Sequence, residues 1–425
     1  MTLAFVLLFL LQTRATPACS DVADCRTQAE SAATRGDFEA FHDLAWRAVQ
    51  KGRRNDTDLM YLLARAQSLS GRPDDSLVML ERIADLNVET DAATNPDFAR
   101  VRQLARWPEL AAKLGVPVSP DASSSPSPGG AAGAAPAAPT APAPAAPAAP
   151  STPPAPAPGS LSFDAPAATL PVALGHDAVS RRFVLGDRSA ARLVVIDEMS
   201  HHVVNYASAA TAGFYDQVTG LAIDARRGDL WVASARGTGA SAVSTLHKLQ
   251  LVSGRTLLEV PTADGAGATR LVDVTVTPDG TVYAIDDVDA RLFRARPGAR
   301  RLELVMRLQA AHPTAVTAVD DRVLYIAADQ GLLRVDLGSN KATSVKSVEE
   351  LTRFVSLAWR GGALVGVERV ADSFLVVRVA LDPSGTHAQP RAILAASTEP
   401  TVGTLTPEGY YYLASPGAIR LAKVK

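Results

Sequence analysis

The C-terminal half of the chain repeats one β-rich pattern. Each copy has an alternating strand, a tight polar turn, a second strand with a large residue, another turn and a third strand. The large residues are separated by 52, 42, 40 and 46 positions, and they are Trp231, Tyr283, Tyr325, Val365 and Tyr411. A sixth, more divergent copy begins at Ser180. Sheets of this size cannot bury both faces alone, so neighbouring units must cover one another.

Units of this length and content are typical of β-propeller blades, and we predict a six-bladed β-propeller over residues 161–425. The last copy ends at Lys425 after three strands. We therefore expect the segment "SLSFDAPAATLPVAL", at the start of this region, to supply the missing outer strand and close the ring.

Residues 20 to 116 have helical periodicity, with breaks at Gly36 and Gly71, one helical-hairpin period apart. The pattern resembles tetratricopeptide repeats: Leu63-Ala64 matches the large-small pair of the first helix, and Leu80 matches the packing residue of the second. The segment "NPDFARVRQLARWPELAAKLG" is similar to the helices that close such arrays. The resemblance implies an all-α repeat domain over residues 19–117, acting as a protein-binding surface or as a scaffold.

Residues 118–160 are rich in Pro, Ala and Ser and contain almost no charge. Such a segment cannot bury enough apolar surface to fold, so we predict a disordered, semi-stiff linker between the two domains. A proline-motif ligand for another protein is the alternative interpretation.

Leu3 to Leu11 is an apolar run, too short to span a bilayer and suited to a signal peptide over residues 1–18, although no Lys or Arg precedes it. We therefore expect an exported protein, periplasmic or extracellular. Cys19 and Cys25 are the only cysteines, and an oxidising compartment favours a disulfide between them. The alternative is a lipid anchor at Cys19, although Thr16 replaces the large aliphatic residue of a lipobox.

The passage "VDVTVTPDGTVYAIDDVDARLFRA" resembles the blades of the gluconolactonase/regucalcin group and the related NHL-repeat proteins. The residues that carry the resemblance are Asp273, Pro278, Asp279, Gly280 and Asp286. In the lactonase branch, carboxylate and asparagine oxygens hold a divalent metal on the propeller axis, where it acts as a Lewis acid on a lactone. The resemblance implies the same fold here.

The metal ligands of that family are mostly missing from this chain. Val272 stands where an asparagine is expected, Thr219 stands at the comparable place in the preceding blade, and the next two blades offer no carboxylate. We therefore predict no catalytic, metal-binding or cofactor-binding residue. Calcium or zinc enters only under the alternative hypothesis of a sugar-lactone or related ester hydrolase with a degenerate metal site.

The leading hypothesis is an exported, non-enzymatic binding or scaffold protein with a protein, peptide or glycan partner. Propeller sites form near inner-strand starts, and the candidates there are Asp216, Thr219, Asp273 and Arg353. A structural envelope protein is a third hypothesis. The net charge of −2 and the lack of a basic aromatic stripe argue against nucleic acid. Asp279-Gly280 is expected in a hairpin turn, and Asp286, Asp287 and Asp289 in the next turn.

Overall fold

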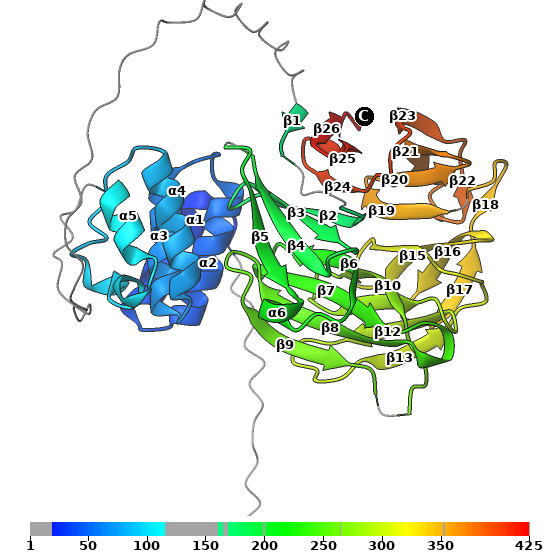
Figure 1. The fold of residues 1–425 in the computed structure, drawn as a ribbon, viewed down its shortest axis with the longest axis horizontal. Helices are drawn as coiled ribbons and strands as arrows, with labels where there is room; N and C mark the ends of the chain where they lie inside the picture. The colour runs from blue at the N-terminus through cyan, green and yellow to red at the C-terminus, as the bar shows by residue number, and fades with distance from the viewer. Residues whose placement is uncertain are drawn as a thin grey trace, which may run out of the picture.

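The computed structural model describes residues 19–114, 160–164, 169–198, 200–263, 265–351 and 353–424. The predicted signal peptide and most of the predicted linker lie outside these ranges. The described chain forms a six-bladed β-propeller preceded by an α-helical region (Figure 1).

Each blade is a four-stranded antiparallel sheet whose strands follow one another along the chain. Blades one to three contain β2 (Pro171–Asp177), β3 (Arg182–Asp187), β4 (Arg192–Asp197), β5 (Val203–Ser208); β6 (Gln217–Asp224), β7 (Asp229–Arg236), β8 (Val243–Gln250), β9 (Thr256–Pro261); and β10 (Leu271–Val276), β11 (Val282–Asp286), β12 (Arg291–Ala295), β13 (Glu303–Arg307). Blades four to six contain β14 (Ala315–Ala318), β15 (Val323–Ala328), β16 (Gly331–Asp336), β17 (Lys341–Ser344); β19 (Phe354–Arg360), β20 (Ala363–Val370), β21 (Ser373–Ala380), β23 (Ala392–Ser397); and β24 (Gly403–Thr406), β25 (Gly409–Ser415), β26 (Ala418–Ala422) with β1 (Ser160–Ser162).

Ring closure joins the two ends of the propeller, as predicted. The strand β1 pairs antiparallel with β26, with Leu161 opposite Ile419 (Figure 1). Only the first residues of the expected segment serve this purpose. Its last four residues, "PVAL", begin β2, the inner strand of the first blade, because the alternating pattern continues through Asp177.

Smaller elements decorate this frame. A parallel bridge of two residues joins β18 (Lys346–Ser347) to β22 (His387–Ala388) beside blades four and five. One short α-helical turn, α6 (Ala209–Ala212), and one 3-10 turn, η3 (Gly239–Ser241), lie in the first two blades. The hairpin between β10 and β11 turns at Asp279-Gly280, as expected, with Gly280 at φ +88°.

The helical region contains two helical hairpins. Their helices are α1 (Val22–Thr34), α2 (Phe38–Lys51), α3 (Thr57–Leu69) and α4 (Pro73–Asp85). Aspartates cap the first three helices, as Asp56 does when its carboxylate accepts from Leu59 N at 3.2 Å. Gly36 and Gly71 end the first helix of each hairpin at φ +73° and +83°, where other residues would be strained. The expected disulfide joins Cys19 to Cys25, and Cys25 is fully buried beside Ala48.

The segment after α4 differs from the expected pair of closing helices. It forms two 3-10 turns, η1 (Pro96–Phe98) and η2 (Val101–Gln103), and the short helix α5 (Trp107–Lys113). Pro96 and Pro108 stand in the first two positions of η1 and α5, where a proline is tolerated, so each starts a new short element. Tertiary contacts also hold it: Asp97 pairs with Arg65 at 2.6 Å, and Phe98 is fully buried against α3. This piece of chain therefore covers α3.

The helical region packs directly on the first two blades, and its core is continuous with theirs. Trp46 on α2 is 1% exposed and donates from its indole N–H to the carbonyl of Ala225 at 2.6 Å. Its ring lies against Gly228, where an added Cβ would come within 3.2 Å of Trp46 Cη2. Gly228 also has φ +67°, so the turn between β6 and β7 needs glycine for both reasons.

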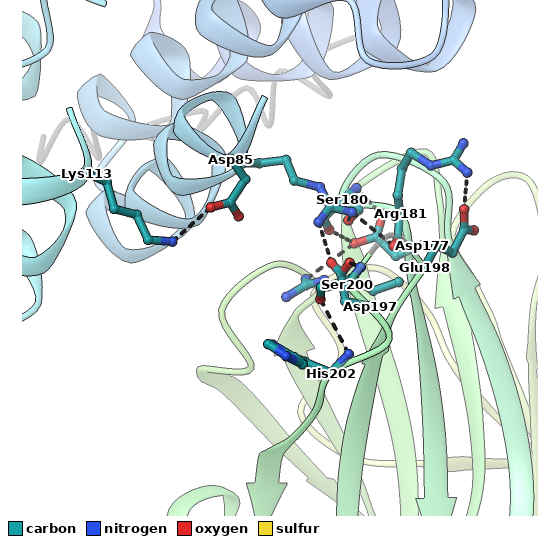
Figure 2. Close-up of polar contacts among 11 residues, drawn as sticks. Asp85, Lys113, Asp177, Ser180, Arg181, Asp197, Glu198, Ser200 and His202 are labelled. Carbon is teal, nitrogen blue, oxygen red and sulfur yellow. Dashed lines mark hydrogen bonds and ion pairs between the residues drawn. The ribbon is translucent and has the colours of Figure 1, made fainter. Parts of the chain in front are cut away.

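A second contact joins α4 to the first blade. Arg82 forms an ion pair with Asp197 and donates to the carbonyl of Ser180 at 2.9 Å. Figure 2 shows the turns that carry Ser180 and Asp197 facing the helices. His201 and His202 follow β4 on this side of the first blade, and both side chains are exposed.

These contacts define two faces of the propeller. Because the strands are antiparallel, turns between the first and second and between the third and fourth strands of a blade lie on one face. We call this the helix-side face, since the turns at 178–181 and 225–228, and Asp197 at the end of β4, contact the helical region. The opposite face carries the remaining turns and the inner-strand starts, and we call it the mouth face. No described helix is long and apolar enough to cross a membrane.

Candidate functional site

The inner strands of four blades share an irregularity at their first residues. In each, the pairing with the second strand skips one residue, which forms a β-bulge. The skipped residues are Val172, Thr219, Val272 and Val355. All four line one hollow on the mouth face, where the bulges turn them toward the propeller axis.

This hollow, the axial mouth, has a volume of about 390 Å³ and takes residues from all six blades. Thr314 and Val402, which precede the inner strands of blades four and six, complete the ring. The volume lies within the range of roughly 300–1,000 Å³ that is usual for small-ligand sites.

The threonine hydroxyl groups around the axial mouth already form hydrogen bonds to backbone carbonyls. Thr219 donates to the carbonyl of Ala233 at 3.3 Å, and Thr314 donates to the carbonyl of Ala327 at 3.5 Å. Thr401, beside Val402, donates in the same way to the carbonyl of Leu413. In blades two, four and six, a threonine thus fixes the inner strand to the second strand.

Blades one and three fix the same place with carboxylates. Asp286, fully buried at the end of β11, accepts from Arg270 N at 2.7 Å and pairs with Arg291 at 2.7 Å. Asp187, at the end of β3, accepts from Leu170 N at 3.1 Å and pairs with Arg192 at 3.0 Å. The acidic turn after β11 is therefore an architectural device repeated between blades.

The carboxylate of Asp273 is also bonded to the backbone. Its carboxylate accepts from Val316 N at 2.8 Å on the neighbouring inner strand and from Val274 N at 2.9 Å. Burial raises the pKa of Asp273 to about 7, although both backbone bonds act against the shift. The group joins blades three and four, and it is a carboxyl that titrates near neutral pH.

The four candidates from the sequence do not converge on one site. Only Thr219 lines the axial mouth. Asp216 is exposed just before β6. Arg353, exposed at φ +56° just before β19, lines a separate hollow with Glu350 and Arg391. All four lie near inner-strand starts, as expected, but of these four side chains only that of Thr219 lines the axial mouth.

Sequence reasoning missed the charged side of the mouth. Arg188 comes from the β3–β4 turn, Arg270 and Asp287 flank blade three, and His312 precedes blade four. Arg270 pairs with Asp287 at 3.4 Å. Arg188 and Asp287 each directly follow a buried aspartate, Asp187 and Asp286, so the position after this aspartate was the available signal.

The mouth does not fit the metal centre of the lactonase branch. Its bulge residues are three valines and a threonine, where Ca²⁺ or Zn²⁺ would need oxygen or nitrogen ligands. Within the ranges described above, no three His, Cys, Asp or Glu side chains gather closely enough to hold a metal ion. We derive no step through a metal.

Comparisons with known proteins bear on the fold. No family model matches the chain, and no curated protein matches it. A gluconolactonase from Xanthomonas campestris is 16% identical, with a TM-score of 0.46 over 62% of this chain and 89% of that one. The major allergen Mala s 1 of Malassezia sympodialis is 13% identical, with a TM-score of 0.49 over 62% and 96%. Virginiamycin B lyase from Staphylococcus aureus, bound to quinupristin, is 13% identical, with a TM-score of 0.45 over 61% and 82%.

These likenesses say nothing about activity, because identity and shape agreement are both low. The assignment of a six-bladed propeller rests instead on the six four-stranded sheets and the closing pair of β1 and β26. The mouth combines an apolar ring with two guanidinium groups, one carboxylate and the imidazole of His312.

Proposed function

We propose that this is an exported, modular binding protein whose ligand site is the axial mouth. One observation carries the proposal: all six blades contribute to a hollow of about 390 Å³ whose ring is apolar or already bonded to the backbone. Such a surface can hold a ligand, but it offers no positioned nucleophile or metal cage.

In this proposal the helical region supports the propeller and is a tetratricopeptide-like repeat of two hairpins. Trp46, Arg82 and Asp75 attach it to the helix-side face, away from the mouth. Because the chain over 91–98 covers α3, the outer surface of α1 is the better candidate for a protein partner. The Pro/Ala/Ser-rich segment before β1 serves as the linker between the two domains.

The test uses the purified full chain. We expect thermal unfolding to shift upward with ligands that fill the mouth, and we expect no turnover of a panel of sugar lactones. Stoichiometric calcium or zinc by elemental analysis, lost in Asp273→Ala together with lactone turnover, would instead establish the hydrolase. Asp216→Ala is the matched control, because this exposed carboxylate lies outside the mouth.

A further inference from the structure

The axial mouth has two unlike sides. Blades one, three and four supply its charged side, formed by Arg188, Arg270, Asp287 and His312. Blades five, six and one supply its apolar side, formed by Val355, Phe374, Pro400, Val402, Leu170 and Val172. A ligand that fills the hollow must therefore meet charge at one end and hydrocarbon at the other.

The charged side has a surplus of positive charge. Of its two guanidinium groups, Arg270 is paired with Asp287 at 3.4 Å. Arg188 has no such ion pair, and within the described chain its buried Nε lacks a hydrogen-bond partner. Burial and the nearby Arg270 lower the pKa of Arg188, while Asp287 opposes this shift. An anionic ligand bound beside Arg188 would supply a negatively charged partner for its guanidinium group.

The apolar side offers few hydrogen-bond donors. Pro171 and Pro400 line this side, and a proline has no backbone N–H. Leu170, at the rim, is 53% exposed and extends this apolar lining beside Val172. A peptide backbone needs donors for its carbonyls, whereas a hydrocarbon chain needs none, so the surface favours hydrocarbon.

We propose that the axial mouth binds a small amphipathic carboxylate: its carboxylate on Arg188 and Arg270, and its hydrocarbon body over Leu170, Val355 and Phe374. This inference rests on the proposed function, since it takes the mouth as the ligand site, and it adds the chemical class of the ligand.

The test is calorimetric titration of the full chain with decanoate, decanol, decylamine and acetate. Decanoate should bind at least about tenfold more tightly than decanol, because a hydrogen bond to a charged group contributes more than one between neutral groups. Acetate should show no measurable binding, because it lacks the hydrocarbon. A decapeptide with an apolar C-terminus, free or amidated, tests the other source of a carboxylate.

Variants locate the ligand. Arg188→Gln should weaken decanoate binding about tenfold and leave decanol unchanged. Leu170→Ser should weaken both about threefold, and its exposure makes misfolding no concern. Arg420→Gln, an exposed arginine on β26, is the matched control and should change neither.

The binding results distinguish the class of ligand from the existence of the binding site. Equal binding of decanol and decanoate, or tighter binding of decylamine, overturns the carboxylate assignment and leaves the mouth as a binding site. Tighter binding of the free peptide than of decanoate, lost on amidation, overturns the small ligand in favour of a peptide terminus. No binding by any of these probes overturns this inference, and lactone turnover with bound metal overturns the proposed function itself.

Discussion

The two faces of the propeller are built from the same kinds of turn but differ in how their polar and apolar groups are satisfied. On the helix-side face, the helical region accepts and donates the bonds that the turns leave open, as Trp46 does at Ala225 and Arg82 at Ser180. On the mouth face, Arg188 has a buried Nε without a partner among the described residues, as Arg82, Arg181 and Arg182 have near the helix-side face, and Leu170 is 53% exposed. Unbonded groups therefore occur on both faces, and the difference is that the helical region covers one face, whereas the hollow of the axial mouth lies on the other.

The helix-side face also contains a carboxylate for which burial is costly. Asp75, in the first turn of α4, is 4% exposed at the helix-side interface, and its Oδ1 has no hydrogen-bond partner in the described residues. Burial raises the pKa of Asp75 to about 6, against the opposing effects of Ser253, Arg72, Arg255 and Arg182. Even the covered face therefore contains one charged group that its surroundings disfavour.

The largest expected effect tests whether the helix-side contact stabilises the molecule. Trp46→Ala should lower the free energy of unfolding by about 3–5 kcal/mol, because it empties a buried site and removes the bond to Ala225. Urea unfolding of the full chain measures it. Trp107→Ala is the control, since Trp107 is only partly buried on α5. An equal loss in both variants would show that the contact of Trp46 with the propeller contributes no more to the free energy of unfolding than the contacts of Trp107 do.

The next effect tests the architectural role of the acidic turn on the mouth face. Asp286→Ala should cost about 3 kcal/mol, because it leaves Arg291, at 3% side-chain exposure, with only a longer ion pair of 3.6 Å to the exposed Asp289. Asp289→Ala, three residues away and 45% exposed, should change stability by less than about 0.5 kcal/mol. Thermal unfolding of the two variants would refute the architectural role if their losses were the same.

A third effect concerns the buried carboxyl of the helix-side face. The folded protein holds the Asp75 proton up to about pH 6, whereas an exposed aspartate loses it near 3.8. The unfolding free energy should therefore fall as pH rises from about 4 to about 6, because the folded state binds more protons there. Asp75→Asn should remove this loss and stabilise the protein at pH 7.5 by about 2–3 kcal/mol.

Denaturant unfolding at pH 4.5 and pH 7.5 measures this pH dependence. The adjacent exposed Asp74 provides the matched control, and Asp74→Asn should leave the profile of the natural chain unchanged. A gain in Asp75→Asn that is the same at both pH values would mean that the carboxyl does not titrate between them.

The smallest effect concerns two residues chosen from the sequence. Asp216→Ala and Arg353→Ala should each change stability by less than about 0.5 kcal/mol, because both side chains are exposed. Neither should change decanoate binding, because neither lines the axial mouth. A binding loss in either variant, measured by the same calorimetry, would move the ligand site toward the outer rim.

Much of the architecture could be predicted from the sequence because it depends on local or periodic signals. The repeat of β-rich units gave the number of blades, and the missing last strand gave the ring closure that β1 and β26 make. The turn at Asp279-Gly280 and the breaks at Gly36 and Gly71 follow from backbone conformations that favour glycine. The prediction of closing helices directly after α4 was wrong, because tertiary contacts of Asp97 and Phe98 outweighed helical periodicity there.

The sequence by itself determined the blades, the ring and the class of each turn, since these depend on neighbours along the chain. Only the tertiary structure decided the two faces. Trp46 contacts Gly228, and Arg188 lies near Arg270. The members of each pair are far apart in the sequence, and no periodic pattern relates them. Closing the ring brings six inner-strand starts to one axis, and the helical region then covers the other side. A mouth with one basic and one apolar side therefore exists only once the ring has closed.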